Sequence, residues 1–148
     1  MLVLPHFIQI LNLSTFGNMK IVEEIKSLIK EANETTDVSK LIDLNLKISG
    51  YLVYVSEETA TALRAKLIAY NERKEWEANY CITSDEGITK AEKAATVKSK
   101  PQRMAELETE VTYNKIKGFV TQLNEFQQAL RQKVSYLRRE SENSNQQP

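Results

Sequence analysis

Three glutamates at alternate positions, Glu106, Glu108 and Glu110, are the first candidates for chemistry in this chain. Alternate spacing on a helix scatters the three carboxylates over different faces and no His or Asp stands near, so we expect a solvated face rather than a metal or acid–base site. Cys81 and His6 are the only residues of their types, which excludes a zinc site built from them and argues against a nucleophilic Cys–His pair. Four scattered glycines could not build phosphate-binding or nucleophile-elbow motifs. We predict no catalytic, metal or cofactor site, and no enzyme.

Basic side chains form two groups that could contact an anion or a nucleic acid. They comprise Lys98, Lys100 and Arg103 at the start of the last predicted helix, and Arg131, Lys133, Arg138 and Arg139 near its end. Free N–H groups at a helix start favour anions, whereas cations near a helix end also complement its dipole without any ligand. Twenty basic and twenty acidic residues cancel, which argues against bulk electrostatic attraction to nucleic acid or membrane.

Aromatic side chains are the third candidate feature. Tyrosine and tryptophan favour half-buried positions and interfaces, so they could belong to the core or to a partner surface. The residues predicted for such a surface are Tyr51, Tyr54, Trp76 and Tyr80.

Few turn-forming residues are available to position these groups. The 148 residues include only 4 glycines and 3 prolines, while 41% are hydrophobic and 27% charged, as in a folded protein with long elements. Apolar spacing predicts a short helix over Lys20–Asn33, with Thr36 or Asp37 capping the next one. Thr89 and Glu92 match a capping box before a short helix over Lys90–Thr96.

Two long helices are predicted over Val38–Tyr80 and Pro101–Arg139. The apolar stripe of the first includes Leu63, Leu67 and Tyr70, although Gly50–Val55 could also suit a short strand. The second carries a heptad seam with one polar interruption at Gln127, formed by Ile116, Val120, Leu123, Gln127, Leu130, Val134 and Leu137. Proline is favoured in a first helical turn, so Pro101 marks its start.

Both long helices would run to roughly 60 Å. The predicted fold is therefore all-α, a long antiparallel, coiled-coil-like helical hairpin with a short N-terminal helix and a short helix in the connecting turn. A single hairpin leaves part of each apolar stripe in water, which favours a homo-oligomer.

The chain ends differ from this helical domain, which we place at residues 19–140. Residues 1–18 are apolar and could precede a natural start at Met19, form an export signal, or pack as a real segment; the break in pattern favours the first. Residues 141–148 are polar, which predicts a disordered tail. The lone cysteine fits a reducing cytoplasm.

The run from Thr89 to Ala95, followed by the long helix from Tyr113 to Leu137, resembles small, mostly uncharacterised helical proteins of tailed phages and prophages. The likeness covers roughly residues 57–139 and implies a host-cell cytoplasmic setting, but no catalytic residue. The preferred hypothesis is a non-enzymatic interaction protein from this setting, which binds a protein partner through its aromatic and apolar stripe. The alternatives are a nucleic-acid-binding accessory factor in recombination or replication, and a counter-defence protein that sequesters a nucleotide signal or blocks an immune effector.

Overall fold

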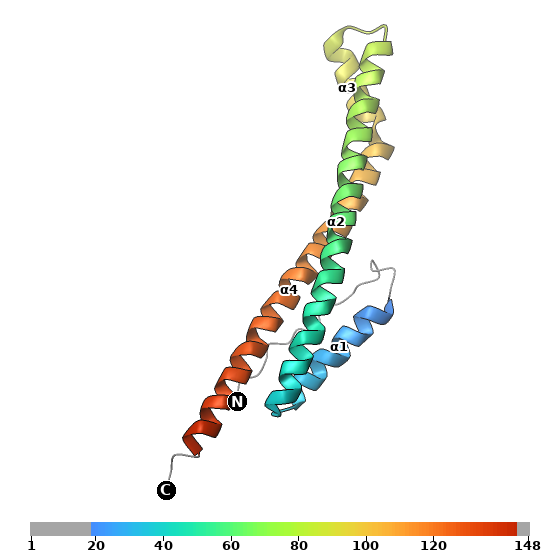
Figure 1. The fold of residues 1–148 in the computed structure, drawn as a ribbon. Helices are drawn as coiled ribbons and strands as arrows, with labels where there is room; N and C mark the ends of the chain where they lie inside the picture. Colours follow the sequence, from blue (N-terminus) through green and yellow to red (C-terminus); the bar gives the residue numbers. More distant parts are fainter. Residues whose placement is uncertain (1–18, 145–148) are drawn as a thin grey trace. The chain divides into compact units, whose positions relative to one another are not determined.

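The computed structural model describes residues 19–144, and all four of the regular elements in this range are α-helices. They are α1 (Met19–Glu34), α2 (Val38–Thr83), α3 (Ile88–Lys98) and α4 (Lys100–Ser144) (Figure 1). The prediction of an all-α protein is confirmed for these residues. The contrasting segments at 1–18 and 145–148 lie outside the described residues.

Gly50–Val55 lies inside α2, in agreement with the helix predicted over Val38–Tyr80, and the strand alternative is wrong. The structure differs from the prediction at two helix ends. α3 begins at Ile88, and the peptide N–H groups of Lys90 and Ala91 donate to the carbonyl of Gly87. Since Gly87 provides the cap without a side chain, the predicted capping box at Thr89 is wrong. α4 continues through residues 141–144, where the sequence predicts a tail.

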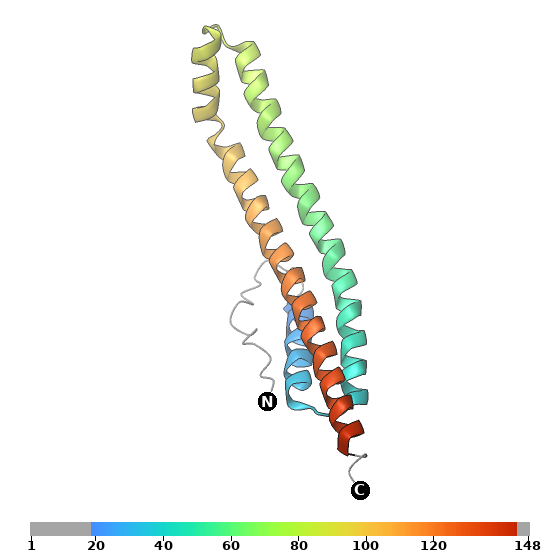
Figure 2. The same ribbon diagram turned by 90° about the vertical axis from the view of Figure 1, so that its left-hand side faces the viewer.

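Tertiary contacts divide the chain into two units, where the sequence predicts a single domain. Unit 1 consists of the described residues in 1–56 and 117–148, and unit 2 of Glu57–Ile116. In unit 1, α1 lies beside the first part of α2 and the last part of α4 (Figures 1 and 2). The Tyr51 hydroxyl on α2 donates to Glu24 on α1 at 2.6 Å, and the Lys133 ammonium on α4 donates to the carbonyl of Ala32 on α1 at 2.8 Å.

Large apolar side chains fill the interior of unit 1. Its buried residues on the three helix segments are Val22, Ile25, Ile29, Ala32, Leu41, Leu44, Ile48, Val55, Phe119, Leu123, Phe126 and Leu130. The polar interruption of the predicted seam, Gln127, is also buried, and its side-chain amide donates to the Ser49 hydroxyl on α2. A buried amide with a partner avoids the loss of free energy that an unpaired one would suffer.

Unit 2 is built from the second part of α2, from α3, and from the first part of α4. Three ion pairs link α2 to α4, Lys66 with Glu110, Arg73 with Glu106 and Glu77 with Arg103. Because the α4 partner moves toward the N-terminus as α2 advances, the two helix segments of unit 2 are antiparallel. Its buried apolar residues are Ala62, Ala69, Ala91, Ala95 and Ile116, which are small except for Ile116.

The start of α2 provides a test of helix capping. The Asp37 carboxylate accepts hydrogen bonds from the N–H groups of Ser39 at 2.9 Å and Lys40 at 3.3 Å, as the sequence predicts for one of its two candidate caps. Replacement of Asp37 by alanine should lower the free energy of unfolding by about 1 kcal/mol, since two N–H groups lose their acceptor. Urea denaturation followed by circular dichroism measures this, with Asp43→Ala on the exposed face of α2 as the matched control. Equal effects of the two substitutions would contradict the capping role.

Candidate functional site

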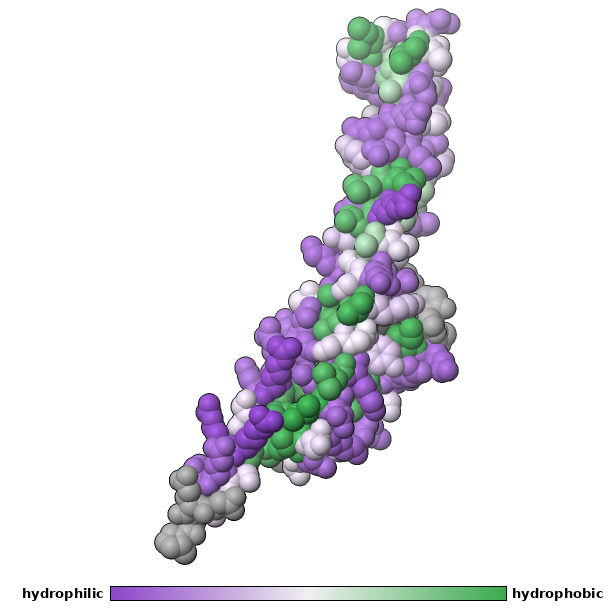
Figure 3. Space-filling model, viewed as in Figure 1, coloured by the Kyte–Doolittle hydropathy of each residue, from purple (hydrophilic) through white to green (hydrophobic). Residues whose placement is uncertain are grey.

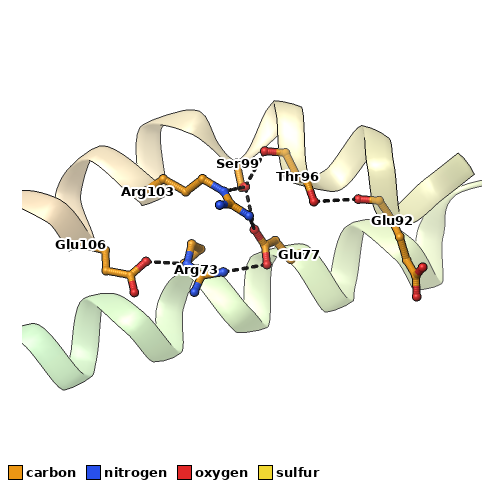
Figure 4. Close-up of polar contacts among 7 residues, drawn as sticks. All are labelled: Arg73, Glu77, Glu92, Thr96, Ser99, Arg103 and Glu106. Atoms are coloured by element: carbon orange, nitrogen blue, oxygen red, sulfur yellow. Dashed lines mark hydrogen bonds and ion pairs between the residues drawn. The ribbon is translucent and has the colours of Figure 1, made fainter. Parts of the chain in front are cut away.

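A polar cluster in unit 2 joins α2, α3 and α4 through the carboxylate of Glu77 (Figure 4). One oxygen of Glu77 accepts from the Ser99 hydroxyl at 2.8 Å and from Arg103 at 2.9 Å, and the other accepts from Arg73 at 2.9 Å. Arg73 also donates to Glu106 on α4. Ser99, fully buried between α3 and α4, accepts a further hydrogen bond from Arg103 at 3.1 Å.

The charges of this cluster balance, with two arginines facing two glutamates. Burial raises the pKa of Glu77, but hydrogen bonds from Ser99 and Arg103 and the charges of Arg73 and Arg103 outweigh it and hold this pKa below its ordinary value. The hydrogen bond from Arg73 to Glu106 raises the pKa of the Arg73 guanidinium. Both groups therefore stay ionised and paired at neutral pH, and the arrangement fixes helix positions rather than activating a nucleophile or a proton donor.

The first predicted basic group is partly engaged within the chain. The Lys98 ammonium donates to the Tyr80 hydroxyl at 2.8 Å, and Arg103 belongs to the polar cluster. Lys100 is exposed at the first position of α4. Lys98 and Arg103 thus contact partners within the chain, whereas Lys100 has neither a side-chain hydrogen bond nor an ion pair among the described residues.

The second basic group divides in the same way. The Lys133 ammonium donates to the carbonyls of Ala32 and Asn33 at the C-terminal end of α1. The sequence predicts instead that Lys133 complements the C-terminal end of its own helix, α4. Burial lowers the pKa of Lys133. Arg131, Arg138 and Arg139 are exposed on α4 and have no ion-pair partner in the described part of the chain.

The four predicted partner-surface aromatics are half-buried. Tyr51 donates to Glu24, and Trp76 stacks on Tyr80 with ring centroids 5.6 Å apart. Tyr54 on α2 is also engaged in an intramolecular contact. These side chains contribute to the packing of the two units, and their exposed parts are smaller than those of other apolar residues.

The large exposed apolar side chains are concentrated in unit 2. Ten of the thirteen in the described residues lie there, namely Leu63, Leu67, Ile68, Tyr70, Ile82, Ile88, Val97, Met104, Leu107 and Val111, whereas Leu46, Val53 and Tyr136 lie in unit 1. Figure 3 shows apolar patches among hydrophilic side chains in the upper part of the view, where unit 2 lies. Leu63, Leu67 and Tyr70 of the predicted apolar stripe are therefore exposed, whereas Ala62 and Ala69 take the inward positions.

Two exposed stripes can be defined from these residues. The α2 stripe contains Leu63, Leu67 and Tyr70, which follow one another at steps of four and three residues. The α4 stripe contains Met104, Leu107 and Val111, at steps of three and four. Each set lies on one side of its helix, because such steps return to nearly the same angle about the helix axis.

Unit 1 contains a groove of about 300 Å³ between α2 and α4. It is lined by Ile42 and Asn45 from α2 and by Arg131, Val134 and Arg138 from α4. The side-chain oxygen of Asn45 is buried and has no hydrogen-bond partner. The sequence identifies the arginines as basic candidates, but not the apolar residues between which they lie.

Comparison with known proteins gives no match to a family model, a curated protein or a solved structure. The resemblance to helical phage proteins therefore stays a prediction from the sequence. In the part of the chain that the structure describes, no helix is long and apolar enough to cross a membrane, and no three Cys, His, Asp or Glu side chains gather closely enough to hold a metal ion.

The Glu77 carboxylate makes the stability of unit 2 depend on pH. Since its folded-state pKa lies below the ordinary value of 4.5, ionised Glu77 stabilises the folded chain above that pH, and this contribution is lost as the pH falls through the folded-state pKa. Glu77→Gln should lower the free energy of unfolding by about 2 kcal/mol at neutral pH, since charged hydrogen bonds are lost. It should also flatten the fall in stability below pH 4.5.

Urea denaturation of both chains across the acid range measures this effect, with Glu108→Gln at an exposed position of α4 as the control. Parallel pH profiles for the natural chain and Glu77→Gln would show that Glu77 does not contribute in this way.

Proposed function

We propose that the protein is a non-enzymatic helical interaction protein that binds a protein partner through the α2 and α4 stripes of unit 2. One observation carries this proposal: unit 2 buries four alanines and one isoleucine, holds half-buried ion pairs between its helices, and exposes leucine, isoleucine, methionine, valine and tyrosine. A helical unit that is stable without a partner shows the opposite distribution, with large apolar side chains buried in its interior. Large exposed apolar surface is typical of a site that another protein covers.

The free energy available from covering the stripes is sufficient for association. Leu67, Met104 and Leu107 are each about half exposed, at 52%, 49% and 51%. Full burial of a side chain of this size stabilises by about 1.5–3 kcal/mol, so half of that is available from each. Since association costs about 4–15 kcal/mol, a partner has to cover most residues of both stripes together rather than one of them.

The spacing of the stripes favours a helical partner. Steps of three and four residues are those of coiled-coil seams, in which apolar side chains of one helix insert between those of another. A second copy of this chain offers two such helices, so self-association is the first form of the proposal to test. The scaffold that presents the stripes is the predicted long antiparallel hairpin, and the phage or prophage setting comes from the sequence resemblance alone.

A protein partner is favoured over a nucleic acid by the use of the basic residues. Lys98, Arg103 and Lys133 donate hydrogen bonds to acceptors within the chain, so they are less available to phosphates. The net charge is +0, which provides no long-range attraction to a polyanion.

Charged substitutions in the stripes test the proposal. We expect the natural chain to exceed the monomer mass in light scattering as its concentration rises, and the double variant Leu67→Glu, Leu107→Glu to remain monomeric, because buried carboxylates oppose the contact. Leu46→Glu is the matched control, since Leu46 is 65% exposed in unit 1 and outside both stripes. Circular dichroism verifies that all three chains are folded.

A monomeric natural chain would rule out self-association as the function of the stripes. The heterologous form is then tested by comparing proteins retained from host extract by the natural chain, by Leu46→Glu and by the double variant. Retention of the same proteins by all three, or of none by any, would overturn the proposal.

A further inference from the structure

We propose that the groove of unit 1 is a second binding site, which takes an acidic amphipathic helix of another protein. This inference does not rest on the stripes of unit 2, because it concerns different residues in a different unit. In Figure 3, apolar surface lies between the lower parts of α2 and α4 with strongly hydrophilic side chains beside it.

Two arginines line the groove with the apolar stems of their side chains and place positive charge at its rim. Arg131 and Arg138 both line it, both are exposed, and neither has an ion-pair partner among residues 19–144. They are seven residues apart on α4, which places them on the same face with a separation of roughly 10 Å along the helix. Lys133, which lies between them in sequence, is directed to the end of α1 and takes no part.

The groove between the arginines is apolar. Val134 from α4 and Ile42 from α2 line it, and both are half-buried. A partner that fits must therefore place an apolar side chain at the centre and a negative group on either side. Guanidinium groups bind carboxylates through two parallel hydrogen bonds, which makes carboxylates well suited to these positions.

A helix meets these requirements at regular spacing. Two glutamates seven residues apart on a helix are also separated by roughly 10 Å and share a face, and the positions between them place apolar side chains on that face. A single-stranded nucleic acid fits less well, because no aromatic side chain lines the groove to stack on its bases.

A second copy of this chain does not provide such a helix. In the sequence, acidic residues stand seven apart only at Glu24 with Glu31 and at Asp85 with Glu92. Glu24 accepts the Tyr51 hydroxyl and Glu31 pairs with Lys40 at 2.8 Å. Asp85 lies between α2 and α3, outside both helices. The partner is therefore a different protein.

A synthetic helix tests the site directly. The probe is a fluorescent amphipathic peptide of four helical turns with glutamates seven apart and leucines at the two central positions. Fluorescence anisotropy should show binding to the full chain that weakens as salt rises. A second peptide, with glutamine in place of both glutamates, should bind at least tenfold more weakly.

Substitutions in the chain separate the groove from general charge. Arg131→Gln and Arg138→Gln should each weaken binding about tenfold and the double variant more than either, because each removes one carboxylate contact. Arg139→Gln is the matched control, as Arg139 is an exposed neighbour that does not line the groove. Its affinity should equal that of the natural chain, and all variants should keep the natural helical content in circular dichroism.

Three results would overturn the inference. They are no binding of the acidic peptide at low salt, equal binding of the acidic and glutamine peptides, and an Arg139→Gln effect as large as that of the groove arginines. Tight binding of a labelled single-stranded oligonucleotide that depends on Arg131 and Arg138, in place of peptide binding, would also overturn it and assign the groove to nucleic acid. The double variant Leu67→Glu, Leu107→Glu should bind the peptide normally, which separates failure here from failure of the proposed function.

Discussion

The carboxylate of Glu77 is the interaction on which the arrangement of unit 2 depends. It receives donors from Arg73 on its own helix, from Arg103 on α4 and from Ser99 between α3 and α4. With a side chain only 17% exposed, an ionised carboxylate that lacked these partners would be strongly destabilising. These contacts favour the observed register of the three helix segments, because a shift along α2 or α4 separates the paired charges.

The helix register that these polar contacts favour determines which side chains of unit 2 face the solvent. With Arg73, Glu77 and Glu106 between the helices, the inward apolar positions hold Ala62 and Ala69, whose small side chains allow close approach. The larger leucines, methionine and valine then occupy outer positions. Unit 1 shows the alternative, in which a third helix is present and residues such as Ile25 and Phe126 are fully enclosed. The two long helices thus bury large apolar side chains where α1 packs on them, and expose most of their large apolar side chains where it does not.

The sequence predicts the helices well, because their signals are local. Apolar spacing, Asp37 before α2 and Pro101 in the first turn of α4 act within a few residues, and the structure agrees with each within the usual variation of helix ends. The exposure of Leu63, Leu67 and Tyr70 could not be predicted in this way. Periodicity shows that apolar residues share one side of a helix, but not whether that side faces the partner helix. Arg73 and Glu77 are spaced as an ordinary surface pair, and only their cross-helix contacts with Glu106, Ser99 and Arg103 distinguish them. The groove could not be predicted either, because Ile42 and Asn45 come together with Arg131 and Arg138 only through tertiary packing.

The two proposed surfaces differ in the force that would hold a partner, and this difference has a functional consequence. The stripes of unit 2 consist of apolar side chains, so their contacts are non-directional and persist or strengthen in salts that are excluded from protein surfaces. The groove of unit 1 offers two exposed cations beside a small apolar centre, so its contacts would select the sequence of the partner and weaken as salt screens the charges. An apolar surface adds affinity with little discrimination, whereas a charged groove adds discrimination with modest affinity. A protein that carries both can hold one helical partner firmly and still choose among others by charge.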